Sequence, residues 1–75
     1  MTVDPLTGEF EKIQWELKSF LLRMTASVQD AEDIMQETYL KAHSRIDTFR
    51  GESSLKTWMF SIALNLARDL LRSRK

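Results

Sequence analysis

Cysteine is absent from this chain, and the 75 residues include one histidine, one proline and two glycines. Without cysteine, neither a disulfide framework nor a cysteine-based zinc site can form, and a lone imidazole rarely holds a metal without carboxylate help. No pairing of a nucleophile with a base and no phosphate-binding glycine loop can be assembled from the remaining residues. We therefore expect a protein that is not an enzyme and that uses no cofactor.

Long apolar runs are also missing. Lys, Arg, Asp or Asn interrupts each apolar stretch within a few residues, and no basic segment leads into an apolar run at the N-terminus. We expect a soluble cytoplasmic protein without membrane contact or targeting segment. A chain of this length suffices for one small domain that buries about 60% of its unfolded surface, so a single core of modest stability is expected.

The formal net charge of zero conceals a separation of charge along the chain. Residues 1–40 hold eight acidic and three basic residues, whereas residues 41–75 hold eight basic and three acidic ones. Small helical proteins often segregate charge by chance. The alternative is a protein with two partners, one basic and one polyanionic.

Hydrophobic periodicity predicts an all-α fold, with helices at about residues 7–24, 28–45 and 54–74. Residues 46–54 form a turn and loop, in which Gly51 permits backbone angles that other residues resist. No strand alternation, internal repeat or low-complexity stretch interrupts this pattern. The predicted architecture is a compact three-helix bundle with a loop before the third helix, forming one domain of all 75 residues.

Helix-start signals and apolar stripes give this prediction its detail. The expected starts are Asp4-Pro5, Ser27 with Asp30, and Ser53 or Ser54. The residues expected to point into the core are Phe10, Ile13, Leu17, Phe20, Leu21 and Met24 in the first helix, Ala31, Ile34, Met35, Thr38, Ala42 and Tyr39 in the second, and Leu55, Trp58, Met59, Ile62, Leu66 and Leu70 in the third. His43 is expected to be half-buried. Trp15 and Leu22 lie off the main stripe, and packing against another helix or the remainder of a longer protein explains them better than ligand binding.

Polar residues form rows on two of the helices. On the second helix, Asp33, Gln36, Glu37 and Lys41 share one face and Leu40 is exposed beside them, although such a row is usually solvated surface. On the third helix, a row within an arc of about 80° suits a phosphate backbone and consists of Thr57, Ser61, Asn65, Arg68, Arg72 and Lys75.

The loop at residues 49–54 offers hydroxyls, a glycine and backbone donors at a helix start, which together can hydrogen-bond a base edge. The simpler alternative for the loop is an ordinary capped turn. The simpler alternative for the row on the third helix is a solvated basic helix end.

The region from residue 30 to residue 60 resembles the second conserved region of bacterial sigma factors of the extracytoplasmic-function group, in the sigma-70 family. The resemblance rests on Asp-Ile-Met-Gln-Glu at residues 33–37 and on Phe-Arg-Gly-Glu-Ser-Ser-Leu-Lys-Thr-Trp-Met-Phe at residues 49–60. It is specific from about residue 30 to residue 74, while the first helix agrees only in length and apolar pattern. Complete members continue into a second helix-turn-helix domain, region 4, which reads the minus-thirty-five element and is absent from these 75 residues.

The resemblance implies that the second helix binds the RNA polymerase core, at the coiled-coil clamp helices of the largest subunit. Asp33, Gln36 and Glu37 match the family motif residue by residue. Together with Leu40 as an apolar anchor and with Lys41, they form the expected polymerase-binding set. An anti-sigma factor that covers the same surface is a further expected partner.

The resemblance also implies that the protein recognises promoter DNA and helps to melt its minus-ten element. In this reading the loop receives a base flipped out of the non-template single strand, Asn65 contacts a base edge, and nearby cations position phosphates. The expected DNA-binding residues are Phe49, Arg50, Gly51, Glu52, Ser53, Ser54, Lys56, Thr57, Ser61, Asn65, Arg68 and Arg72.

Three positions depart from the family pattern: Ser61 and Leu64 stand where many members place Arg, and His43 stands where Trp is common. These changes remove charge and stacking area. They favour the alternative function, a sigma-like regulatory module that binds polymerase or an anti-sigma factor without reading DNA. Strongly salt-dependent binding of single-stranded DNA distinguishes the two functions, and a monomer is expected in both cases.

Overall fold

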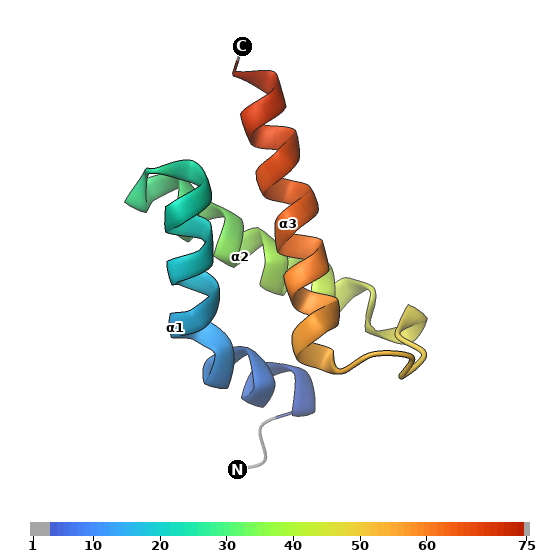
Figure 1. Ribbon diagram of the computed structural model, residues 1–75. Coiled ribbons are helices and arrows are strands. Elements are labelled where there is room, and N and C mark those ends of the chain that lie inside the picture. The colour runs from blue at the N-terminus through green and yellow to red at the C-terminus, as the bar shows by residue number, and fades with distance from the viewer. Residues whose placement is uncertain (1–3, 75) are drawn as a thin grey trace.

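Three α-helices form the protein in the computed structural model, which describes residues 4–74. They are α1 (Pro5–Thr25), α2 (Val28–Ser44) and α3 (Leu55–Ser73), and a short 3-10 helix, η1 (Ile46–Thr48), lies between α2 and α3. Each α-helix packs against the other two. Figure 1 shows α1 and α3 on the near side, with α2 passing behind α3 and the η1 loop projecting to the right. The predicted all-α bundle is confirmed, although the predicted turn after α2 contains the 3-10 helix.

Each α-helix begins at a side chain that accepts a hydrogen bond from the backbone three residues later. The pairs are Asp4 with Thr7 at 2.9 Å, Ser27 with Asp30 at 3.1 Å and Ser54 with Thr57 at 3.1 Å. These bonds satisfy amide groups that have no acceptor within the helix. The bond from the Thr7 amide also holds the pKa of the Asp4 carboxyl below its ordinary value. The helix starts follow the sequence closely, and Ser54 rather than Ser53 caps α3.

The core is small and contains alanine where the helices meet. Its largest fully buried side chains are Leu17, Leu21, Met59 and Thr38. The Thr38 hydroxyl donates a hydrogen bond to the Ile34 carbonyl at 2.7 Å, so this buried polar group is satisfied. The buried apolar residues are Leu6, Ile13, Leu17, Leu21, Ala31, Ile34, Met35, Ala42, Met59, Ala63 and Ala67.

The face of α3 that packs against the core differs from the face predicted from its large apolar residues. Met59 is fully buried as expected, but the next core positions are Ala63 and Ala67, which have no exposed surface. Ile62 and Leu66 lie beside them and are only half-buried. Because alanine has no side chain beyond Cβ, its helix can approach a neighbour closely, and the larger residues then fill the margins of the contact.

Two expectations for single side chains are also corrected. Leu6, which the predicted stripe omitted, is buried: α1 begins at Pro5, at the Asp4-Pro5 start signal and two residues before the approximate bound at residue 7. His43 is exposed rather than half-buried: its ring packs on the outer side of Tyr39, with centroids 5.9 Å apart. Tyr39 in turn meets Phe10 at 5.2 Å and hydrogen-bonds Thr7 at 2.8 Å, so it fills the space between α1 and α2.

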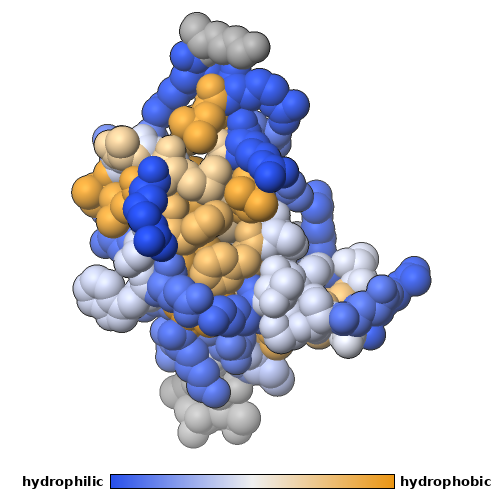
Figure 2. Space-filling view, viewed as in Figure 1, coloured by the Kyte–Doolittle hydropathy of each residue, from blue (hydrophilic) through white to orange (hydrophobic). Residues whose placement is uncertain are grey.

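The contact between α1 and α3 combines aromatic packing with an ion pair. Phe20 of α1 meets Phe60 of α3 with ring centroids 5.6 Å apart, and Lys56 lies 2.9 Å from Glu16. Figure 2 shows apolar side chains gathered over the seam between these two helices. Phe60 is therefore packed against another aromatic ring at the margin of the core.

Enlarging the alanine at the α3 crossing tests this packing. Ala63→Leu is expected to lower the free energy of unfolding by about 1–3 kcal/mol, because the added atoms have no space between close-packed helices. The matched control is Ser61→Leu, which adds a leucine at an exposed position of the same helix and is expected to change stability by less than about 0.5 kcal/mol. Urea denaturation measures both. Equal effects of the two substitutions would contradict close packing at Ala63.

Candidate functional site

The outer face of α2 presents a polar ridge that ends in one exposed apolar residue. We call Asp33, Gln36, Glu37 and Leu40 the docking ridge; all four are exposed, and 58% of the Leu40 surface is accessible. The ridge lies opposite the buried face of α2, so packing of the helix fixes its outward direction. Lys41, which the sequence placed with this set, is half-buried and lies at its edge.

A groove of about 400 Å³ runs beside the docking ridge, between α2 and α3. Ile34, Leu66 and Leu70 give it an apolar lining, and the four ridge residues form its α2 side. The structure therefore brings the predicted polymerase-binding residues together with apolar positions of α3. Leu66 and Leu70 were predicted to be core, yet part of their surface faces this groove.

One end of this groove is closed by an ion pair. The two terminal guanidinium nitrogens of Arg74, Nη1 and Nη2, donate to the carboxylate of Asp30, whose side chain is only 14% exposed. The Arg74 hydrogen bond holds the pKa of the Asp30 carboxyl below its ordinary value, and Asp30 raises the pKa of Arg74. A bidentate pair of this kind fixes geometry as well as charge. It joins the last residue that the structure describes to the first turn of α2.

The polar row of α3 points away from the bundle. Thr57, Ser61, Asn65, Arg68 and Arg72 are all exposed, as predicted, while Lys75 lies outside the described residues. A shallow hollow of about 480 Å³ follows the C-terminal half of this row, from Asn65 to Arg72. Arg72 forms an ion pair with Asp69, which lies one turn away. Arg68 lies one turn after Asn65, so the row contains both an amide and a cation.

Lys56 does not belong to this row, although the sequence grouped it with the DNA-binding residues. It is half-buried and its ammonium group lies 2.9 Å from the carboxylate of Glu16 on α1. Lys56 therefore faces the α1 side of α3, whereas Asn65 and Arg68 face outward. The partner that holds it lies 40 residues away in the sequence, so no local pattern indicates this contact.

The loop before α3 forms a small hollow beside two aromatic rings. Thr48, Phe49, Arg50, Glu52, Ser53 and Trp58 line a volume of about 200 Å³. Phe49 and Trp58 pack with their centroids 5.1 Å apart, so the Trp58 ring is one wall of the hollow. The sequence pattern predicted Trp58 only as a core residue. Its spacing from Phe49 across a glycine-containing loop was the signal that the Trp58 ring could also form a wall of this hollow.

Backbone geometry shapes the tip of this loop. Gly51 has a φ of 75°, in the left-handed region that favours glycine. Ser54 uses its hydroxyl to cap α3, while residues 50–53 remain exposed. In the view of Figure 2 the loop projects from the body of the protein and ends in hydrophilic side chains. A partner can therefore reach the hollow without displacing any α-helix.

Two kinds of site do not occur in residues 4–74. No three His, Asp or Glu side chains of this segment are grouped so that they could hold a metal ion. No helix in the same segment has the length and apolar character needed to span a membrane.

A helical domain that presents an acidic ridge on one helix and a polar row with a hollowed loop on another is typical of a module that binds two macromolecules. The family described as Sigma-70 region 2 matches residues 10–75, and this chain belongs to that family. Sigma factors are transcription factors rather than enzymes, and the matched region includes the docking ridge, the loop and the whole of α3.

Named relatives agree with this assignment. The chain is 41% identical to the ECF RNA polymerase sigma factor SigG of Mycobacterium tuberculosis over 96% of its own length and 20% of that protein. It is 42% identical to the ECF RNA polymerase sigma factor SigW of Bacillus subtilis over 71% of its length and 28% of that protein. It is 35% identical to the RNA polymerase sigma-H factor of Pseudomonas aeruginosa over 84% and 33%. The chain thus spans about a fifth to a third of the length of these relatives.

The pair between Asp30 and Arg74 predicts how stability depends on pH. Because the pKa of Asp30 is lower in the folded protein than in the unfolded chain, its carboxylate stabilises the fold above about pH 4, and this contribution is lost as the pH falls through the folded pKa. Asp30→Asn is therefore expected to lower the Tm at pH 7, with the difference from the parent shrinking toward pH 3.

Thermal unfolding followed by circular dichroism at several pH values measures this difference. The control is Asp47→Asn, which removes an exposed carboxylate from η1 and is expected to change the Tm little at either pH. If Asp30→Asn lowers the Tm by the same amount at pH 3 and at pH 7, the charge of Asp30 is not the cause of the difference.

Proposed function

We propose that this domain acts in transcription initiation, binding the RNA polymerase core through α2 and recognising and helping to melt the promoter minus-ten element through the loop and α3. One observation carries the proposal: within the family-matched segment, the docking ridge and the polar row occupy outward faces of two different helices. Two partners can therefore be held at once without competing for the same side chains.

The docking ridge has the composition of a small interaction site. Leu40 supplies exposed apolar area, and Asp33, Gln36 and Glu37 precede it on the same face with groups that pair with basic and polar side chains. Interfaces of this kind have an apolar centre and a polar rim, and a few residues supply most of the binding energy. The proposed partner surface is the coiled coil of the clamp helices on the largest polymerase subunit. The groove between α2 and α3 can receive one of its side chains.

The loop and α3 have groups suited to an unpaired DNA strand. Extruding a base costs a few kcal/mol, and stacking on an aromatic ring together with hydrogen bonds to the base edge returns a comparable amount. The loop hollow offers both, because Phe49 and Trp58 form its aromatic wall and Ser53 contributes a hydroxyl at its rim. The residues proposed to bind DNA are Phe49, Arg50, Gly51, Glu52, Ser53, Ser54, Thr57, Ser61, Asn65, Arg68 and Arg72.

The cations of α3 differ in how directly they can reach phosphate. Lys56 and Arg74 are held by carboxylates of α1 and α2, so we assign neither to the main phosphate contact. Arg72 can exchange Asp69 for a phosphate at small cost, because an exposed ion pair contributes at most about 1 kcal/mol. Arg68 makes no ion pair within residues 4–74 and is the proposed principal phosphate contact.

The two proposed partners, polymerase and DNA, also determine where the protein is proposed to act. The protein is expected to act as a monomer in the cytoplasm, where both partners are found. An anti-sigma factor is a further proposed partner, since a protein that covers the exposed Leu40 and its acidic neighbours prevents polymerase from binding.

Calorimetric titration with a peptide of the clamp-helix coiled coil tests the polymerase side. The double variant Gln36→Ala, Glu37→Lys is expected to abolish measurable binding, because it removes an amide contact and reverses a charge at the centre of the ridge. The control is Asp47→Lys, an equal charge reversal at an exposed position of η1, which is expected to bind as the parent does. Unimpaired binding by a folded double variant would contradict the assignment of the docking ridge.

Binding to single-stranded minus-ten oligonucleotides tests the DNA side. Asn65→Ala is expected to reduce discrimination at one base by about 1–3 kcal/mol, because an amide can donate to and accept from a base edge. Arg68→Ala is expected to weaken all sequences alike and to make the dependence of log K on log salt shallower by about 0.7.

Fluorescence anisotropy at several salt concentrations separates these effects. The control is Gln29→Ala, which removes an exposed amide from the first turn of α2 and is expected to leave DNA binding unchanged. Equal losses on every oligonucleotide for Asn65→Ala would contradict base reading. A folded parent that binds the clamp helices but no DNA would favour a regulatory module that does not read promoters.

A further inference from the structure

An apolar hollow opens at the end of the bundle where α1 and α3 begin. It has a volume of about 410 Å³, which is within the range of sites that take small molecules. Figure 1 shows the first turns of α1 and α3 at this end of the molecule, beside the segment that contains η1. We call it the basal hollow, and its lining consists of Asp4, Pro5, Leu6, His43, Ile46, Phe49 and Leu55. Neither the docking ridge nor the polar row of α3 accounts for it.

Five of the seven residues that line the basal hollow are apolar. Leu6 is only 3% exposed and belongs to the core. Ile46, Phe49 and Leu55 are half-buried, so the bundle leaves part of their apolar surface in contact with water. An apolar group that covers this surface is bound favourably, because it removes apolar area from water.

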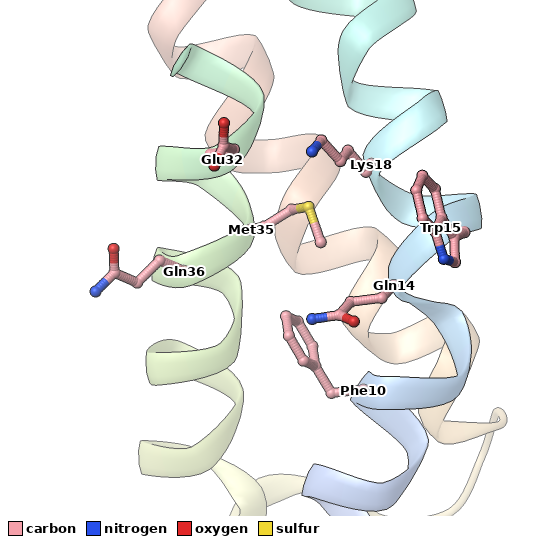
Figure 3. A pocket seen from close by; sticks show the side chains of 7 residues that line it. All are labelled: Phe10, Gln14, Trp15, Lys18, Glu32, Met35 and Gln36. Carbon is pink, nitrogen blue, oxygen red and sulfur yellow. The ribbon is translucent and has the colours of Figure 1, made fainter. Parts of the chain in front are cut away.

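Charge distinguishes the basal hollow from the hollow between α1 and α2. Figure 3 shows that Lys18 of α1 and Glu32 of α2, which carry opposite charges, border the hollow between those helices. The basal hollow has one carboxylate, Asp4, whose two oxygens each accept a hydrogen bond from Thr7 at 2.9 Å. A negative charge at the rim repels phosphate. The basal hollow is therefore suited to an apolar group of a ligand rather than to the backbone of a DNA strand.

Phe49 connects the basal hollow with the hollow in the loop before α3. It lines both volumes, so its ring stands between them. On the loop side this ring packs against Trp58. Proteins that bind unpaired strands stack successive bases on aromatic side chains. A strand that places one base in the loop hollow therefore brings an adjacent nucleotide to the basal hollow.

The four DNA bases differ in how well they suit an apolar lining. Thymine alone carries a methyl group, and apolar side chains recognise that group by direct contact. The polar edge of the base can stay at the rim of the hollow. There the imidazole of the exposed His43 can donate a hydrogen bond to the base or accept one from it.

We propose that the basal hollow is a second base-binding subsite, which takes a thymine adjacent to the base in the loop hollow and recognises it by its C5-methyl group. The proposal rests on the proposed function, because it assigns one further nucleotide of the same unpaired strand. In the complex the methyl group lies against Ile46 and Leu55, and the thymine ring lies against Phe49.

Oligonucleotides that differ by one methyl group test this subsite. Thymine is replaced by uracil at each position of a single-stranded minus-ten oligonucleotide in turn, and fluorescence anisotropy measures the affinity of the parent protein. The replacement is expected to weaken binding about three- to fivefold at one position, which is the effect of removing one buried methyl group. At that position 5-methylcytosine is expected to bind more tightly than cytosine by a similar factor. Equal affinity for thymine and uracil at every position would overturn the proposal.

A substitution in the protein locates the methyl contact. Leu55→Ala shortens an apolar wall of the basal hollow, so the affinities for the thymine and uracil oligonucleotides are expected to become nearly equal. The control is Val28→Ala, an apolar truncation at the exposed first residue of α2, which is expected to keep the preference of the parent. Circular dichroism checks that both variants fold, and the series in the parent protein decides if Leu55→Ala does not. A thymine preference that a folded Leu55→Ala retains in full would place the methyl contact elsewhere and contradict the proposal.

The same titrations separate this subsite from the proposed function. If the parent binds the oligonucleotides and Asn65→Ala changes base discrimination, but thymine and uracil bind alike throughout, the second subsite is wrong and the proposed function stands. If the folded parent binds none of the oligonucleotides, the second subsite and the proposed reading of DNA fail together.

Discussion

Close approach of the three helices at alanine positions is the constraint on which both proposed surfaces depend. Ala31 and Ala42 of α2 and Ala63 and Ala67 of α3 have no exposed surface, so the helix backbones rather than long side chains set the spacing. Packing of this kind tolerates little rotation of a helix about its axis, because turning α3 would drive larger residues into the crossing. The outward direction of Asn65 is therefore determined by the residues on the opposite side of its own helix.

Ion pairs complete this arrangement at both ends of α3. Lys56 joins the first turn of α3 to Glu16 of α1, and Arg74 joins the last described residue to Asp30 of α2. The pair between Lys56 and Glu16 is exposed, so it contributes little to stability and mainly fixes position. Asp30 is mostly buried in its pair with Arg74, which therefore also stabilises the fold. The two pairs also divide the basic residues of α3 into two groups: Lys56 and Arg74 are paired with carboxylates of other helices, whereas Arg68 makes no ion pair within residues 4–74.

Prediction from the sequence was most accurate for features whose signal lies within a single helix. Capping side chains at Asp4 and Ser27 located helix starts, and the apolar face of α2 was correct because its buried residues are separated cleanly from an acidic outer face. The prediction of the buried face was less accurate for α3. Leucine is more hydrophobic than alanine and was therefore assigned to the core, whereas close packing of helices favours the smaller residue at the contact. The surroundings of Lys56 depend on Glu16, which lies on another helix, so this neighbour could not be read from a local pattern. The contact of Trp58 with Phe49 spans only the loop before α3, and their spacing was a signal for it. The roles of the site residues remain predictions drawn from the family.

The separation of an acidic first half from a basic second half gives this neutral domain an electric dipole moment. A net charge of zero means that a distant polyanion neither attracts nor repels the molecule as a whole. At closer range the field of the polyanion exerts a torque, which turns the basic end of the chain toward it and the acidic residues of α1 and α2 away. A polyanion that approaches the molecule is then met first by the basic residues of the second half, with the opposite pole still facing solvent.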